Sequence, residues 1–236
     1  MYAQDLLALD ALPLLPRLVH GAEEPDPTLT LFAAVLPAPF LAEVPTSWPG
    51  RVSSEPEPGA IWLVPARRMG QLMPLARAAG ESGALAFGLD FAAPDGTGDT
   101  RPRAREDLAE LKGACGLPFV VAGILDPRDV EASVEAGADL VVACSRVSEV
   151  IGGPSLPGLL AELRDAAAEV PLVARGGMRG GADALKYLAL GADAVLLPSE
   201  LNPERVAREF THALRLTGCR NLKEVQYDLI YEPTFE

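Results

Sequence analysis

Apolar runs and amphipathic segments alternate along this chain from residue 60 onward. Continuous runs of Val, Leu and Ala are typical of parallel strands buried on both faces, and apolar residues spaced three and four apart predict helices. The apolar runs predict strands at residues 60–64, 84–90, 118–122, 138–143, 171–174 and 194–197. The amphipathic segments predict helices at residues 71–79, 105–114, 127–136, 156–169, 182–190 and 203–217.

The segment before residue 60 has a weaker pattern. It predicts a helix at residues 4–19, a polar link at 23–27 and an apolar run at 29–36. Residues 37–59 are rich in proline, which interrupts helices and central strands. We therefore expect loop there, with at most one short strand at 51–53, and the pattern leaves open whether this segment completes a sheet.

Strands that alternate with helices predict an α/β protein with a parallel sheet and right-handed crossovers. The best fit is a (β/α)8 TIM barrel with a shortened or irregular N-terminal half, and a doubly wound open sheet is the alternative. We expect one domain over the 236 residues, with a helix and link at 1–27 and a tail at 218–236. A barrel places its functional site at the C-terminal ends of its strands.

Composition narrows the classes of function. Asp and Glu outnumber Lys and Arg by 33 to 20, a net charge of −13 that disfavours nucleic acid and anionic membranes as partners. No apolar run reaches membrane-spanning length, and the start of the sequence lacks the basic residues of a secretory signal, so we expect a cytoplasmic protein. Three cysteines without metal-ligand spacing predict free thiols and no metal site.

A glycine-rich turn separates the strand at 171–174 from the helix that follows it. Glycines let a backbone approach a ligand closely, and unpaired N–H groups at the start of a helix attract phosphate. Two arginines add positive charge. The predicted anion site therefore consists of Arg175, Gly176, Gly177, Arg179, Gly180 and Gly181. A purely structural role for these glycines, in ending the strand and starting the helix, is the alternative.

Three phrases carry a resemblance to a known family: LPFVVAGILDPRDVEASVEAGADLVV, GGMRGGADALKYLALGADAVLL and TGCRNLKEV. Over residues 108–225 the chain resembles the C-terminal half of the FMN-dependent α-hydroxy-acid dehydrogenase/oxidase family, the glycolate oxidase and lactate oxidase group. IWLVPARR and ALAFGLDFAAP look like that family's third and fourth barrel strands. The resemblance implies a TIM barrel and FMN as the cofactor, although the chain is shorter than typical members.

The resemblance also shows which catalytic residues of the family are replaced. The lysine that supports the flavin ring matches Ala122, the histidine that takes the substrate proton matches Ser145, and the arginine that holds the substrate carboxylate matches Ser148. The aspartate that partners the histidine is retained as Asp90. Loss of a general base alone typically costs a factor of about 10²–10⁴ in rate. We therefore expect that the chain is not a competent α-hydroxy-acid oxidase.

The positions that match the family's binding site for the FMN phosphate are better preserved than the catalytic positions. The family's Asp-Gly-Gly-Ile-Arg run matches residues 175–179, where Arg175 replaces the aspartate, while both glycines and the second arginine remain. The family's Gly-Arg pair after the eighth strand matches Pro198 and Ser199. Proline has no N–H to offer a phosphate, so Ser199 is the remaining candidate ligand there.

Three hypotheses follow. The first is a barrel that binds FMN or another phosphorylated ligand at residues 175–181 but lacks the family's oxidation chemistry, and the retained GGMRGG favours it. The second is an enzyme of changed chemistry that uses Asp90, Cys144 or Ser145, with Arg146 activating the thiol. The third is a non-catalytic scaffold or interaction protein that assembles with itself or with a protein partner.

Overall fold

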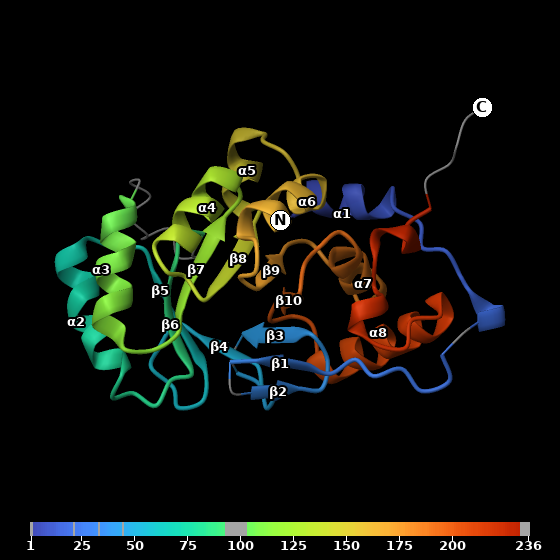
Figure 1. Ribbon diagram of the computed structural model, residues 1–236, viewed down its shortest axis with the longest axis horizontal. Coiled ribbons are helices and arrows are strands. Elements are labelled where there is room, and N and C mark those ends of the chain that lie inside the picture. The colour runs from blue at the N-terminus through green and yellow to red at the C-terminus, as the bar shows by residue number, and fades with distance from the viewer. Residues whose placement is uncertain (1, 21, 33, 44, 93–102, 232–236) are drawn as a thin grey trace.

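The computed structural model describes residues 2–231 apart from 21, 33, 44 and 93–102. Eight parallel strands form a closed barrel in the order β10-β3-β4-β5-β6-β7-β8-β9 (Figure 1). They are β3 (Phe40–Glu43), β4 (Arg51–Ser53), β5 (Ile61–Pro65), β6 (Ala86–Asp90), β7 (Phe119–Ile124), β8 (Leu140–Cys144), β9 (Leu172–Arg175) and β10 (Ala194–Leu197). The TIM barrel prediction is confirmed, and closure of the sheet excludes the doubly wound alternative.

Helices follow the strands from β5 onward and form the outer layer. They are α2 (Met69–Ala79), α3 (Arg105–Cys115), α4 (Pro127–Glu135), α6 (Leu156–Ala167), α7 (Gly181–Ala189) and α8 (Pro203–Thr217). The described residues between β3 and β5 contain no helix, so the N-terminal half of the barrel is irregular, as predicted. None of the helices in the described ranges is long and apolar enough to cross a membrane.

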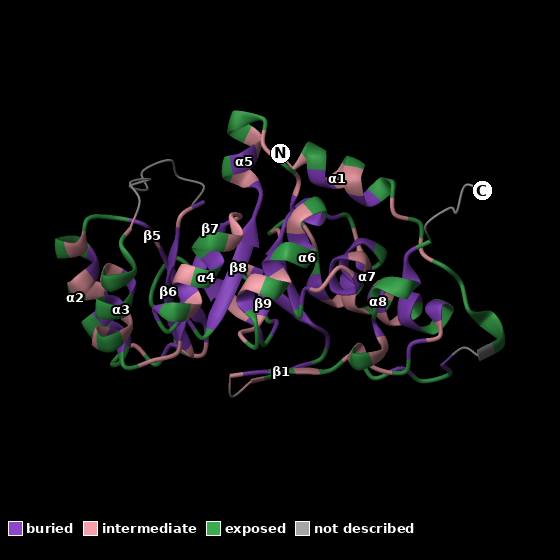
Figure 2. Cartoon of the chain, turned by 45° about the horizontal axis from the view of Figure 1, so that its top comes forward, coloured by how far each residue is buried: buried purple, intermediate pink, exposed green. Residues whose placement is uncertain are grey.

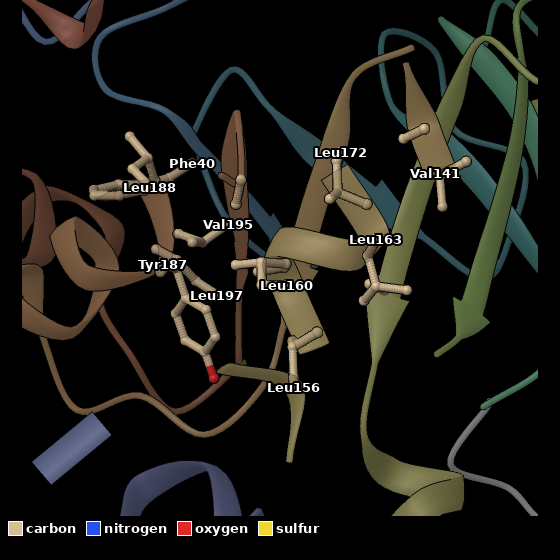
Figure 3. Close-up of a cluster of buried hydrophobic side chains, with 14 of the residues drawn as sticks. Phe40, Val141, Leu156, Leu160, Leu163, Leu172, Tyr187, Leu188, Val195 and Leu197 are labelled. Atoms are coloured by element: carbon tan, nitrogen blue, oxygen red, sulfur yellow. The ribbon is translucent and has the colours of Figure 1, made fainter. Parts of the chain in front are cut away.

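The apolar core has two layers. One fills the inside of the barrel with side chains such as Leu63, Val142 and Leu196. The other lies between the strands and the outer helices, where Figure 3 shows Leu160 and Tyr187 facing strand residues. Strand residues therefore contact apolar neighbours on both faces, which explains their continuous apolar runs.

Residues 37–59 contribute two barrel strands, and the expectation of at most one was wrong. β3 pairs with β10 on one side and with β4 on the other, so this proline-rich segment closes the barrel. Each strand is only three or four residues long. Runs this short, next to prolines, carry too little pattern to separate a buried strand from a loop.

The predicted helix at 4–19 was too long. α1 spans Ala3–Asp10, and only a 3-10 turn, η1 (Leu18–His20), follows before the link. Pro13 and Pro16 explain the difference, because a proline inside a helix removes a hydrogen bond and clashes with the preceding turn. Leu14 instead forms a β-bridge with Ile230 near the C-terminus.

Three elements cover the two ends of the barrel. The hairpin of β1 (Leu29–Leu31) and β2 (Ala34–Leu36) packs against the inner core. It lies at the opposite end from α1 and α5 (Arg146–Ile151), as Figures 1 and 2 show. The helix α5 was not predicted. α1 and α5 lie at the C-terminal ends of the strands, where a barrel carries its site.

Candidate functional site

The C-terminal end of the barrel, here called the mouth, gathers most of the predicted residues. β6 ends at Asp90, β8 at Cys144 and β9 at Arg175, and parallel strands bring these residues to one rim. β3 adds Glu43, an acid that the sequence analysis did not identify because its strand was not predicted. The ends of these four strands thus bring Arg175 together with the carboxylates of Asp90 and Glu43 and the thiol of Cys144.

Arg175 joins two acids across the mouth. Its guanidinium donates from Nη1 to Asp90 Oδ2 and from Nη2 to Glu43 Oε1, both at 2.6 Å. The side chains of Arg175 and Asp90 are only 10% and 8% exposed. Burial lowers the pKa of Arg175, but the neighbouring negative groups outweigh burial and the net pKa lies above its usual value. This ion triad of Arg175, Asp90 and Glu43 therefore keeps its arginine charged and internally paired.

Ser145, the predicted replacement for the family's base, faces an acid rather than open space. Its Oγ donates to Asp5 Oδ2 at 2.5 Å, and Ser145 is fully buried. The backbone N–H of Gly177 donates to the same oxygen at 3.2 Å, and the N–H of Leu156 donates to Asp5 Oδ1 at 2.9 Å. We call these three donors the Asp5 cradle. They come from the end of β8, the turn after β9 and the first turn of α6.

Cys144 is buried at 1% exposure, and this burial raises the pKa of its thiol. The backbone hydrogen bond from Arg146 and the positive charge of Arg175 lower that pKa, but burial outweighs both. The Tyr2 hydroxyl lies 3.6 Å from Cys144 Sγ, and the Arg146 guanidinium lies 6.0 Å from the Tyr2 ring centre. The geometry therefore argues against an activated Cys144 thiolate, one of the three alternatives of the second hypothesis.

The predicted anion site, here called the glycine turn (residues 176–181), binds carboxylates of the chain itself. Besides the bond from Gly177 to Asp5, the N–H of Arg179 donates to Asp183 at 3.0 Å and the N–H of Gly181 to Glu209 at 3.1 Å. The turn therefore has the donor pattern of an anion site, and in this structure protein acids fill it.

Arg179 is paired in the same way. Its Nε and Nη2 contact Asp183 at 2.9 and 3.1 Å, and Nη2 also contacts Asp10 of α1 at 2.6 Å. These hydrogen bonds, to Asp183 first and then to Asp10, raise the pKa of Arg179 above its usual value. Half of the Arg179 side chain stays exposed, at 52%, so solvent reaches this cation at the edge of the mouth.

Close packing accounts for the glycines themselves. A Cβ on Gly176 would lie 2.2 Å from the Tyr187 hydroxyl, and one on Gly177 would lie 2.7 Å from the backbone oxygen of Tyr2. A Cβ on Gly180 would meet Glu209 Oε2 at 2.3 Å, and one on Gly181 would meet the backbone N of Phe210 at 2.1 Å. The structural reading is therefore supported at Gly176, Gly177 and Gly181, whereas at Gly180 the near atom is the end of the flexible Glu209 side chain, which can move away.

Ser199, the last predicted cofactor ligand, lies at a different place from the glycine turn. It lines a cavity of about 660 Å³ between the ends of β3 and β10, together with residues such as Thr46 and Arg208. Glu43, Glu200 and Glu204 also line this cavity, and residues 176–181 do not. The lining of this cavity thus includes Ser199 but none of the other predicted ligands.

The sequence analysis missed three residues of the mouth: Tyr2, Asp5 and Glu43. Tyr2 and Asp5 reach the mouth only because α1 folds back over it, a contact between positions 140 or more residues apart. No local pattern encodes such a contact. Glu43 follows a proline-flanked strand, so a polar residue after an apolar run was the one available signal.

Comparisons with known proteins agree with this architecture. The profile of the FMN-dependent dehydrogenase family matches residues 69–200, more than half of the chain. An L-lactate dehydrogenase from Xanthomonas euvesicatoria pv. vesicatoria is 33% identical over 154 residues, which covers 56% of this chain and 38% of that protein. One from Xanthomonas campestris pv. campestris (strain 8004) is 34% identical over 152 residues, with the same coverage. The match thus spans well under half the length of these relatives.

Solved structures show the same fold over nearly the whole chain. A lactate oxidase from Pediococcus acidilactici superposes with a TM-score of 0.80 at 18% identity, covering 98% of this chain and 86% of that one. A mandelate oxidase superposes with a TM-score of 0.75 at 19% identity, covering 96% and 88%. Together with the profile match, which rests on the sequence, these findings show that the chain belongs to the FMN-dependent dehydrogenase family, that of the α-hydroxy-acid oxidases and dehydrogenases.

Proposed function

We propose that this chain binds a phosphorylated ligand at the glycine turn and does not oxidise α-hydroxy acids. One observation carries the binding part of the proposal. Three backbone N–H groups of residues 177–181 each donate to a carboxylate, so the turn recognises oxyanions in its present conformation. A phosphate offers similar acceptor oxygens to the same kind of donor.

FMN is the ligand that membership of an FMN-dependent family implies. The described residues suit its phosphate end, since carboxylates stand at the glycine turn where a phosphate would be held. They do not suit the flavin ring in the arrangement that the structure shows, because the ion triad and Tyr2 occupy the mouth. Ala122, at the position of the family's ring-supporting lysine, is buried inside the barrel and provides no cation. We therefore assign no reaction step to the flavin.

The residues at the mouth also argue against oxidation of an α-hydroxy acid. That reaction needs a base with a pKa near neutrality and a cation that holds the substrate carboxylate. Ser145 and Ser148 occupy those two positions, and Asp90 pairs with Arg175 instead of orienting a base. A serine hydroxyl takes up no proton at neutral pH, so Ser145 does not supply such a base even though its hydroxyl donates to Asp5.

A second candidate function is a non-catalytic scaffold or interaction protein. The observation in its favour is that the chain itself already uses every predicted ligand of the turn. Arg175 and Arg179 pair with protein carboxylates, and packing accounts for Gly176, Gly177 and Gly181. A scaffold would need these residues for stability alone.

Binding of FMN, riboflavin and inorganic phosphate to the purified full chain separates the two candidates. We expect FMN and phosphate to raise the melting temperature, and riboflavin, which lacks the phosphate, to have little effect. Arg179→Ala should weaken the effect. Arg220→Ala is the matched control, because Arg220 is also an exposed arginine in an i,i+4 ion pair, with Glu224, and in the described part of the chain neither residue contacts the turn.

The same preparation tests the absence of oxidation. With FMN present, we expect no reduction of an artificial electron acceptor by glycolate, lactate or mandelate above the rate without protein. Acceptor reduction that depends on the protein would overturn the proposal. If neither FMN nor phosphate binds, the scaffold function is the one that remains.

A further inference from the structure

The Asp5 cradle differs from an ordinary surface hydrogen bond because three separate elements converge on one buried carboxylate. The donors are Ser145 Oγ, the N–H of Gly177 and the N–H of Leu156, at 2.5, 3.2 and 2.9 Å. Leu156 begins α6, a helix of 12 residues, so the positive end of its dipole also faces Asp5. Three converging donors with a helix N-terminus make a built oxyanion site.

The group that fills this site belongs to a short segment with few other contacts. α1 has eight residues, and helices of that length are unstable alone in water. Asp5 and Leu9 are its buried residues, while Leu7 is 71% exposed. Figure 2 shows α1 as a largely exposed helix lying across the mouth. Its remaining polar anchors are Lys186, which donates to the Leu9 carbonyl, and Arg179, which donates to Asp10.

Docking of α1 carries two internal costs. Burial raises the pKa of Asp5, so the charged carboxylate is less favourable there than in water despite its three donors. Tyr2, which precedes α1, has φ 62 and ψ 29, a left-handed conformation that is uncommon for an aromatic residue. Both costs are relieved when the segment leaves the mouth.

We propose that α1 is a tethered occupant of an oxyanion site, so that an external phosphate or carboxylate competes with Asp5 for the cradle. This inference rests on the proposed function, because the N–H of Gly177 belongs to both sites. It adds a regulatory element: ligand binding and docking of α1 exclude each other. Release of α1 also withdraws Tyr2 from Cys144 and Asp10 from Arg179, which leaves the exposed Arg179 with Asp183 as its remaining acidic partner in the described contacts.

Hydrogen exchange of α1 and ligand titration, done on the same full-length variants, test the competition. In the wild-type chain, inorganic phosphate and FMN should increase exchange of the amides of residues 3–10, and sodium chloride at equal ionic strength should not. Asp5→Ala should raise exchange there without ligand. It should also bind phosphate about tenfold more tightly or better, because a site that is closed nine tenths of the time loses that factor in affinity.

Leu7→Ala is the matched control, since it changes α1 at an exposed position and should alter neither measurement. If Asp5→Ala fails to fold, Lys186→Met removes the anchor of α1 at the Leu9 carbonyl but no cradle donor, and it should shift both measurements in the same direction. Equal affinity of wild type and Asp5→Ala, with α1 still protected when ligand is bound, would overturn the competition and leave the proposed function intact. Absence of binding to every variant would instead overturn the proposed function.

Discussion

Gly181 begins α7 at the point where that helix meets the backbone of α8. A Cβ at this position would lie 2.1 Å from the N of Phe210 and 2.5 Å from the C of Glu209, and neither backbone atom can rotate away. The sequence analysis singled out this glycine and left open whether a ligand or the structure requires it. Packing between helices gives a sufficient reason, so glycine content alone is weak support for a binding loop.

We expect Gly181→Ala to lower the free energy of unfolding by about 1–3 kcal/mol, the usual cost of overpacking. Gly113→Ala is the control, because Gly113 lies in α3 with nothing within 4 Å of its added Cβ. That change should raise stability by about 0.4–1 kcal/mol, as alanine restricts the unfolded chain more than glycine does. Urea unfolding measures both. Equal stability of the two variants would contradict the packing role.

The sequence predicted which single residues lie at the mouth, but it did not predict which side chains they contact. Arg175 and Asp90 were both identified, each as a group awaiting a ligand, and the structure pairs them with each other. The third member, Glu43, and the acid that holds Ser145 come from segments whose placement depends on long-range contacts. Sequence spacing carries no information on such contacts, so the internal pairing of the mouth residues could not be predicted.

Among the elements, α1 is the one whose position should depend on pH. Burial raises the pKa of Asp5, and the like charge of Glu149 on α5 adds to the effect, while hydrogen bonds from Ser145, Leu156 and Gly177 partly oppose it. The docked segment therefore takes up a proton more readily than the released one. Docking is favoured as pH falls through the raised pKa toward the ordinary value near 4, and it is weakened above that range.

Native-state hydrogen exchange, corrected for the intrinsic effect of pH, measures this dependence. We expect the opening free energy of residues 3–10 to be larger at pH 5 than at pH 8 in the wild-type chain. Asp5→Asn does not titrate at this position and should show a flat profile. A larger opening free energy at pH 8 in the wild type would contradict the assigned sign.

Most other elements were predictable because burial on both faces leaves a clear signature. The strand at 194–197 and the helix at 203–217 match the structure at both ends. The errors fall where prolines or short lengths weaken the pattern, as in β3, and where a short helix such as α5 lies at the mouth. The helix predicted over 4–19 failed because its apolar spacing continues through two prolines that the backbone cannot accommodate.

At the scale of the whole molecule, β3 closes the barrel, because it pairs with β10 on one side and with β4 on the other. Phe40 lies on this strand with no exposed surface, 5.4 Å from the ring of Phe210 on α8 and 6.3 Å from that of Trp48. Its ring thus connects β3, the first strand of the barrel, with α8 and with the loop between β3 and β4. The N-terminal half of the barrel, although irregular, should unfold together with the rest.

We expect Phe40→Ala to lower the free energy of unfolding by about 3–5 kcal/mol in a single cooperative transition. Val35→Ala, in the β1–β2 hairpin where Val35 is 65% exposed, should change it by less than about 0.5 kcal/mol. Urea unfolding followed by tryptophan fluorescence and circular dichroism gives both values. Two separated transitions in the wild-type chain would show that β3 and the rest of the barrel do not unfold as one unit.

The ion triad makes the present state of the mouth difficult to reverse by stepwise substitution. A histidine introduced at position 145 would meet Asp5, and it would find Asp90 already bound to Arg175. Replacing Arg175 first would leave two carboxylates without their cation, and breaking a buried pair in this way costs about 3–5 kcal/mol. The route through Arg175 therefore passes through an intermediate of lower stability. If the chain has lost base catalysis, as we propose, the charge arrangement acts in evolution as a ratchet against regaining it.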